Sequence, residues 1–253
     1  MIFVVPVALG ILQGLTEFLP VSSSGHLAVA SLLLGVRTDH LGLEVGLHLG
    51  TIAAVAWMYR PDLGRLLHPP WGGETRQLAL GLIAASLVTG MLALFFRGAV
   101  TAAFSSTRAI GLGFAATTLL LAASRRMPGG RREAPSTAAA VFIGAAQGIA
   151  TFPGLSRSGA TIVAGLGTGL GAEAAARFSF LLALPAVAAA SALTLTEGGV
   201  GPTGLLPWLA GVVVSAAVGA ASIALVKRTM VRRRLHLFAL YTGALALLCF
   251  LLP

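Results

Sequence analysis

The sequence predicts an all-α integral membrane protein with six transmembrane helices and two re-entrant broken-helix hairpins, arranged as an inverted-topology repeat of two halves. Three observations predict this fold class: the composition, a series of apolar segments of membrane-spanning length, and one motif that occurs twice. Hydrophobic residues make up 57% of the 253 residues and charged residues only 10%, whereas soluble domains have about 25% charged residues. So few charges could not cover the surface of a soluble fold, and we therefore expect a single membrane domain over residues 1–253.

Six uninterrupted apolar segments are predicted to cross the membrane, because a transmembrane helix needs about 17–25 residues. The segment 109–123 is shorter, and we expect its helix to extend into the flanking residues. The start of the chain has neither the positive region nor the cleavage site of a signal peptide, so no cleaved leader is predicted. The six segments are Leu41–Tyr59, Leu78–Phe96, Ala109–Ala123, Ala174–Thr194, Trp208–Val226 and Leu235–Leu252.

Two further apolar stretches are interrupted, and the two interruptions are copies of each other. A shift of 134 residues superimposes the break near residues 17–26 on the break near residues 151–160, with seven identities and no gap. Each break is followed by three of the predicted spans, so the chain divides into halves of about 1–125 and 135–253. The identical pairs are Gly10/Gly144, Gln13/Gln147, Gly14/Gly148, Phe18/Phe152, Ser22/Ser156, Ser24/Ser158 and Gly25/Gly159.

The broken segments are predicted to be re-entrant hairpins that enter and leave the membrane by the same face. Their second arms, Leu27–Leu34 and Ala160–Leu170, are too short to span alone. Broken helices at membrane depth are tolerated only where the freed backbone is buried in protein or lines a wet cavity. Each half then crosses the membrane three times, so the second half is inverted and both breaks meet near the midplane, as in many transporters.

The distribution of basic residues favours this layout. One predicted face carries twelve Lys and Arg residues and the opposite face three. Short loops rich in Lys and Arg stay in the cytoplasm, so both termini and the first hairpin are predicted to face outward. The net charge of +9 lies in these loops, and we therefore expect no nucleic-acid partner. The basic loops are 60–77, 125–136 and 227–234, and the three opposite residues are Arg37, Arg97 and Arg108.

The ionisable groups near the breaks are the candidates for chemistry, because charged groups inside a membrane are costly and mark functional sites. Where the first copy has Glu17, Ser23 and His26, the second has Thr151, Arg157 and Ala160. The helix break is thus present in both copies, whereas the ionisable and nucleophilic side chains differ between them. We expect one asymmetric site that combines a carboxylate, a hydroxyl, an imidazole and a guanidinium.

The residue types at the breaks suit a phosphate group. Ser-x-Ser-Gly followed by a helix leaves free backbone N–H groups at a helix N-terminus, which is a ready anion site. Arg157 adds a planar fork for phosphate oxygens. His26 is close enough in sequence to reach the Ser23 hydroxyl and activate it as a nucleophile, and Glu17 could orient His26 or hold a divalent cation. The predicted phosphate-binding residues are Ser22, Ser24, Gly25, Ser156, Ser158 and Gly159.

Three further polar residues are weaker candidates. Glu44 and His48 share one helix face and could line the cavity or bind a metal, although a hydrogen-bonded pair near the membrane edge is slightly favoured. Gln13 lies one turn before Glu17 and could face the same site.

The two breaks resemble the signatures of the undecaprenyl-diphosphate phosphatase family, also called the bacitracin-resistance family. The resemblance extends through Leu47–Thr51 and Phe178–Pro185, and so covers essentially the whole chain. The matching motifs are Gln13-Gly-Leu-Thr-Glu17-Phe-Leu-Pro-Val-Ser-Ser23-Ser-Gly-His26 and Pro153-Gly-Leu-Ser-Arg157-Ser-Gly-Ala-Thr-Ile162.

The resemblance implies hydrolysis of undecaprenyl diphosphate to undecaprenyl phosphate and inorganic phosphate, which recycles the lipid carrier of peptidoglycan synthesis and confers bacitracin resistance. It implies a bacterial cytoplasmic (inner) membrane enzyme whose site opens to the periplasmic side. By motif match, Glu17, Ser23, His26 and Arg157 are the catalytic positions. A divalent cation, Mg²⁺ or Ca²⁺, is also implied, with Glu17 as its chief acidic ligand and Gln13 at the first position of the metal-binding element.

Three mechanisms and two functions stay open at this point. Ser23 could attack phosphorus after deprotonation by His26, or His26 could itself be the nucleophile or the base that activates water. The alternative function is a transporter or flippase of a polyprenyl phosphate that uses the same inverted-repeat site. The sequence does not determine the oligomeric state, and a homodimer is one assembly that it allows.

Overall fold

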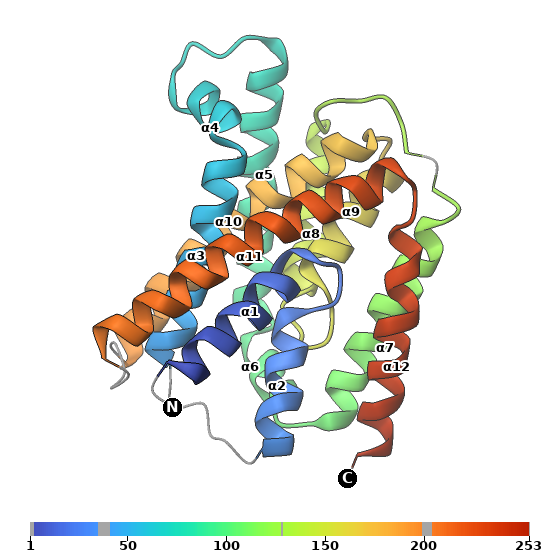
Figure 1. Cartoon of the computed structure of the whole chain (residues 1–253). Coiled ribbons are helices and arrows are strands. Elements are labelled where there is room, and N and C mark those ends of the chain that lie inside the picture. Colours follow the sequence, from blue (N-terminus) through green and yellow to red (C-terminus); the bar gives the residue numbers. More distant parts are fainter. Residues whose placement is uncertain (1–2, 35–40, 128, 199–203, 253) are drawn as a thin grey trace.

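The protein is all-α in the computed structural model, which describes residues 3–34, 41–127, 129–198 and 204–252 (Figure 1). Each predicted span coincides with a helix, and the helix over 109–123 extends at both ends, as expected. Two short helices, α4 and α6, were not predicted and lie between spans. The elements are α1 Val4–Phe18, α2 Ser23–Leu34, α3 Leu41–Met58, α4 Arg60–Leu67, α5 Gly73–Phe95, α6 Arg97–Phe104, α7 Thr107–Ser124, α8 Thr137–Ile149, α9 Arg157–Gly167, α10 Ala172–Gly198, α11 Leu205–Val231, the 3₁₀ turn η1 Leu235–Leu237 and α12 Phe238–Leu251.

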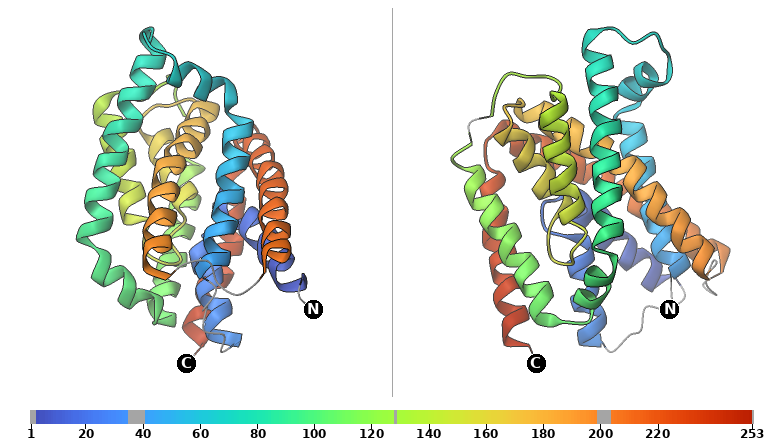
Figure 2. Two further views of the ribbon diagram at one scale, coloured as in Figure 1. Left: turned by 90° about the vertical axis from the view of Figure 1, so that its left-hand side faces the viewer. Right: turned by 180° about the vertical axis from the view of Figure 1, so that it is seen from behind.

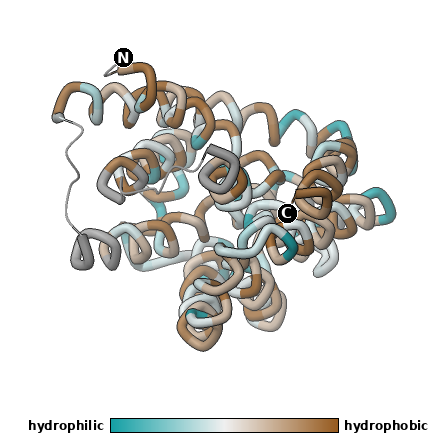
Figure 3. The backbone as a smooth tube through the Cα atoms, turned by 90° about the horizontal axis from the view of Figure 1, so that it is seen from below, coloured by the Kyte–Doolittle hydropathy of each residue, from teal (hydrophilic) through white to brown (hydrophobic). Residues whose placement is uncertain are grey.

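The surface of the protein is that of a multi-pass membrane protein. Within the described residues, α5, α7, α11 and the part of α10 up to Ala192 are long and apolar enough to cross a membrane, while α3 and α12 contain shorter apolar stretches. Phe95 and Leu240 are each 78% exposed, and hydrophobic residues run along much of the outer helices (Figure 3). Exposed apolar area on this scale requires a lipid or protein partner, so the composition-based prediction of a membrane protein is confirmed.

Both interrupted segments fold as helical hairpins. The arms α1 and α2 start and end at the end of the molecule that carries the two termini, and α8 and α9 start and end at the opposite end (Figures 1 and 2). The breaks between the arms, residues 19–22 and 150–156, lie at mid-height between these two ends.

Each hairpin packs its first arm against a helix from the other half of the sequence. Helix α1 lies along α11, and α8 lies along α5. Glycines shared by the two copies allow both approaches: a Cβ atom on Gly14 would lie 2.8 Å from the Ser215 carbonyl oxygen, and one on Gly144 would lie 2.6 Å from Cα of Ala85. Small residues at such positions let helix backbones pack closely in membranes. The repeated glycines thus serve helix packing.

The three basic loops lie together at one end of the molecule. The connection containing α4, the α7–α8 connection and the α11–η1 turn form the upper end in Figure 1, opposite both termini. The loops that the sequence predicts on one membrane face thus lie at one end of the molecule.

Candidate active site

The two breaks touch each other at mid-height. A Cβ atom on Gly25 would lie 2.8 Å from Cα of Gly154, so only glycine allows this approach of the two backbone segments. The hydroxyl of Ser158 donates a hydrogen bond to the carbonyl oxygen of Leu19 at 3.1 Å. Ser22 has a φ of 68°, a left-handed conformation that is uncommon for serine and is frequent at functional sites. The structure therefore brings together the two motifs that lie about 134 residues apart.

Ser22 and Ser156 act as equivalent helix N-caps. The Ser22 hydroxyl accepts a hydrogen bond from the Gly25 N–H at 3.2 Å, and the Ser156 hydroxyl accepts one from the Gly159 N–H at 3.1 Å. These caps satisfy backbone donors that a helix start otherwise leaves unpaired. The Gly25 and Gly159 amides are therefore engaged by the caps in this structure, and phosphate binding by these two predicted residues stays a prediction. The repeated serines cap the starts of α2 and α9. The reactive residues, Ser23 and Arg157, each directly follow one of these caps.

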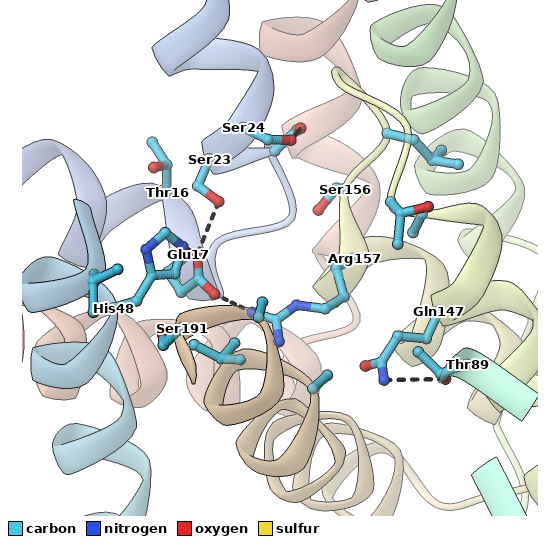
Figure 4. Close-up of a pocket in the computed structure, with 18 residues that line it drawn as sticks. Thr16, Glu17, Ser23, Ser24, His48, Thr89, Gln147, Ser156, Arg157 and Ser191 are labelled. Atoms are coloured by element: carbon cyan, nitrogen blue, oxygen red, sulfur yellow. Dashed lines mark hydrogen bonds and ion pairs between the residues drawn. The ribbon is translucent and has the colours of Figure 1, made fainter. Parts of the chain in front are cut away.

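Glu17 is the centre of the polar cluster (Figure 4). One carboxylate oxygen accepts a hydrogen bond from Arg157 Nη2. The other accepts hydrogen bonds from the Ser23 hydroxyl at 2.8 Å and from Gln13 Nε2 at 2.9 Å. The Glu17 side chain is only 3% exposed, so its charge is held almost entirely by these partners. Three of the four predicted catalytic residues thus meet around one carboxylate.

Glu17, Ser23 and Arg157 line a cavity of about 330 Å³ between the two hairpins and α3, α5 and α10. Of the predicted phosphate-binding residues, Ser22, Ser24 and Ser156 line it, whereas Gly25, Ser158 and Gly159 are buried behind it. Six polar residues outside the predicted set also line the cavity: Thr16, His48, Thr89, Gln147, Thr151 and Ser191.

Arg157, which lines the cavity, has one donor atom without a partner among the described residues. Its Nη1 atom is buried and has no hydrogen-bond partner among the described residues, while Nη2 is bound to Glu17. Unpaired buried donors are costly and rare in folded proteins. A guanidinium with one edge on a carboxylate and the other free is suited to an oxyanion in the cavity.

His26 does not contact Ser23, in contrast to the expectation. Its Nδ1 atom lies 2.7 Å from the Ser22 carbonyl oxygen, and its Nε2 atom lies 2.7 Å from the Tyr241 hydroxyl. Because a carbonyl only accepts, Nδ1 donates, and in the neutral ring Nε2 is left to accept the tyrosine proton. The ring also stacks on Tyr241 and is absent from the cavity lining. Both of its nitrogens are therefore occupied away from the reactive hydroxyl.

The imidazole nearest to the carboxylate is instead that of His48. Its Nε2 atom lies 4.0 Å from Glu17 Oε2, and its side chain is 30% exposed and lines the cavity. The sequence reading slightly favoured a hydrogen-bonded pair with Glu44, whose side chain lies outside the described residues. The sequence places His48 on a predicted span. The direction in which its side chain points depends on the rotation of α3 about its axis, and residue spacing within one helix does not determine that rotation.

The predicted metal ligands lie side by side. Gln13 and Glu17 are hydrogen-bonded to each other, and Gln13 Oε1 is buried without a partner among the described residues. The described part of the chain contains no cluster of three or more His, Cys, Asp or Glu side chains that could hold a metal ion. One carboxylate and one amide oxygen fit Mg²⁺, which keeps water and often takes substrate phosphate oxygens as ligands.

Comparison with known proteins agrees with this arrangement. A family model described as "Bacitracin resistance protein BacA" matches residues 6–248. A protein of Rubrobacter xylanophilus named undecaprenyl-diphosphatase is 40% identical, over 96% of this chain and 95% of its own length. Proteins of the same name from Syntrophotalea carbinolica and Alkaliphilus metalliredigens are 39% and 36% identical, over 95% and 93% of both chains. The chain therefore belongs to the bacitracin-resistance (BacA) family.

Proposed function

We propose that this protein is an undecaprenyl-diphosphatase that hydrolyses undecaprenyl diphosphate to undecaprenyl phosphate and inorganic phosphate. The observation that carries the proposal is the convergence of Ser23, Glu17 and Arg157 on one cavity between two broken helices. Relatives that bear this name match the chain over nearly their whole length. The product is the lipid carrier used in peptidoglycan synthesis, and its recycling accounts for the family's link to bacitracin resistance.

Arg157 and the helix starts bind the diphosphate in this proposal. The terminal phosphoryl group lies in the cavity, where it takes the free Nη1 donors of Arg157. First-turn N–H groups of α2 and α9 that the two caps leave unpaired face the same charge. Phosphoryl transfer depends mainly on such positioning and charge stabilisation. The isoprenoid tail leaves the cavity between helices into the membrane.

Ser23 is the proposed nucleophile and Glu17 the proposed proton acceptor. The Ser23 oxygen forms a bond to the terminal phosphorus as the bond to the bridging oxygen breaks, and the hydroxyl proton passes to Glu17 along the existing hydrogen bond. Undecaprenyl phosphate leaves as an anion. Water then attacks the phosphorus of the phosphoserine and the bond to the serine oxygen breaks. The proton held by Glu17 returns to the serine oxygen, and the oxygen and protons of the water leave with the inorganic phosphate. Direct attack by water activated by Glu17 is the rival route.

A divalent cation, Mg²⁺ or Ca²⁺, is proposed to bind at Glu17 and Gln13. When bound it supplies positive charge that neutralises the diphosphate. Glu17 and Gln13, whose Oε1 atom has no hydrogen-bond partner within the described ranges, are the residues that would hold it.

We further propose the membrane arrangement predicted from the sequence. The six long segments span the bacterial inner membrane, and the hairpins α1–α2 and α8–α9 re-enter from opposite sides. Short loops rich in Lys and Arg stay in the cytoplasm, so the end of the molecule that carries the basic loops faces the cytoplasm. The α1–α2 hairpin starts and ends at the opposite end and therefore opens to the periplasm. The exchanged packing of α1 on α11 and of α8 on α5 supports two inverted halves. A homodimer stays a prediction.

His26 is proposed to be a positioning residue that acts through Ser22 and Tyr241. Replacing Tyr241 with Phe removes one hydrogen bond to the ring, which is worth about 1 kcal/mol. We expect the melting temperature to fall by about 2–4 °C while phosphate release falls less than about tenfold. A larger loss of activity at unchanged stability would make the imidazole part of the chemistry.

The direct test is phosphate release from undecaprenyl diphosphate by the purified protein in detergent, with Arg157→Ala as the inactive control. Release that depends on Arg157 supports the phosphatase. Binding of the lipid without turnover by the wild-type protein would overturn it in favour of a transporter. The same assay with a chelator, and with Mg²⁺ or Ca²⁺ restored, tests the cation: we expect release to stop and then recover.

A further inference from the structure

A second polar cavity lies at the basic end of the molecule, away from the candidate active site. It has a volume of about 160 Å³ and is lined by Arg125 and Arg126 after α7 and by Arg233 after α11. This is roughly five times the volume of one water molecule in the liquid, about 30 Å³. The remaining lining residues are mostly apolar and include Leu166 and Met230. The cavity thus combines three arginine residues with apolar residues at the ends of membrane helices.

The turn that supplies Arg233 also lines a neighbouring cavity of about 320 Å³. Arg228, Arg232 and Arg234 line this neighbour together with Leu237 and Phe238. Successive arginines of the turn therefore belong to different cavities, Arg233 to the first and its two neighbours to the second. One short turn thus supplies arginines to two cavities that also have apolar lining residues.

Arg233 occupies a backbone position that normally favours glycine. Its φ is 52°, and the turn has the two hydrogen bonds of a Schellman motif, from Arg233 N–H to the Met230 carbonyl at 3.0 Å and from Arg234 N–H to the Thr229 carbonyl at 2.9 Å. Glycine is the usual residue at this point of the motif because it lacks Cβ. A non-glycine residue in such a conformation points to a use for its side chain.

The arginines of the first cavity have no acidic partner among the described residues. The ion pairs described for the chain involve Glu17, Asp62 and Glu74, which pair with other groups. Exposed positive charge on cytoplasmic loops is expected from orientation alone. Orientation requires neither a cavity nor an arginine in a left-handed turn, so these two features need another explanation.

We propose that this cavity binds the headgroup of an anionic phospholipid. The phosphate lies between Arg233 and the Arg125–Arg126 pair, whose planar forks suit phosphate oxygens. The acyl chains follow the exposed apolar side of the neighbouring helices, where Val231 is 63% and Leu240 78% exposed. Basic pockets between membrane helices at the membrane surface are a recurring lipid-headgroup site. The apolar walls favour a lipid over a free anion.

The test compares lipid-dependent stability in purified wild-type protein and Arg233→Gly. Glycine suits the left-handed turn, so this variant is expected to melt at or above the wild-type temperature in neutral detergent. Added phosphatidylglycerol should raise the melting temperature of the wild-type protein, and Arg233→Gly should lose most of that rise. The double variant Arg125→Gln/Arg126→Gln, which removes the positive charges on the other side of the cavity, should also lose most of the rise in melting temperature.

The matched control is Arg131→Gln, because Arg131 is exposed, carries the same charge and lines neither cavity. It should respond to phosphatidylglycerol as the wild-type protein does. The proposal fails if Arg233→Gly gains as much from the lipid as the wild-type protein, or if Arg131→Gln loses as much as Arg233→Gly. An equal rise with phosphatidylcholine or with inorganic phosphate would also overturn it, in favour of nonspecific lipid binding or a soluble-anion site.

Discussion

Replacing Arg157 with Ala is expected to reduce phosphate release by at least about 10³-fold, the scale on which an arginine stabilises a phosphoryl transition state. The guanidinium is bound to Glu17 through Nη2, and its buried Nη1 atom has no partner in the described part of the chain. Arg157→Lys keeps the charge but cannot contact the carboxylate and a phosphate in one plane. We therefore expect Arg157→Lys to retain more activity than Arg157→Ala but much less than the wild-type enzyme.

The same substitution is expected to destabilise the protein, and a double variant separates the two effects. Removing Arg157 leaves Glu17, 3% exposed, without its cationic partner, and breaking a buried ion pair in this way costs about 3–5 kcal/mol. Glu17→Gln/Arg157→Ala removes both charges and should recover much of the melting temperature. Phosphate release should stay at the level of Arg157→Ala. Recovery of activity in the double variant would mean that Arg157 only balances the charge of Glu17.

The parts of the fold that the sequence predicted are those that depend on local composition. The length and hydrophobicity of each span are local properties, and every predicted span is a helix in the structure. The contact between the two breaks was predictable from the repeat. Each copy interrupts a helix, and the backbone groups freed at an interruption must be buried in protein or line a wet cavity. Helices α4 and α6 were missed because they are short and lie in polar or mixed connections, where hydrophobic periodicity carries little signal.

The pairing of side chains could be predicted only where the partners lie on the two repeated breaks. Arg157 and Glu17 were expected together, and they form an ion pair. His26 was expected to reach Ser23 because the two are three residues apart, but its ring bonds Tyr241, which is 215 residues away. Likewise the serines expected at the phosphate include two helix caps, since a motif of serine and glycine fits both roles.

Replacing Ser23 with Ala is the second large effect that we expect, a loss of about 10³-fold or more in phosphate release, because the variant lacks the proposed nucleophile. The substitution removes one hydrogen bond to Glu17, so stability should change by only about 1 kcal/mol. The matched control is Ser24→Ala: Ser24 lines the same cavity, but its hydroxyl faces Ser22 at 3.4 Å and is not bonded to Glu17. Ser24→Ala should stay within about tenfold of wild type.

The covalent intermediate distinguishes this mechanism from its rivals. With labelled terminal phosphate and rapid acid quenching, the wild-type protein should carry label on Ser23, and Ser23→Ala should carry none. Label on His26 would contradict the structure, in which both ring nitrogens are occupied by Ser22 and Tyr241. If Ser23→Ala instead keeps most of its activity, the hydroxyl only orients Glu17, and the carboxylate activates water for direct attack. The contact between Ser23 and Glu17 is common to both routes, so only the destination of the phosphoryl group separates them.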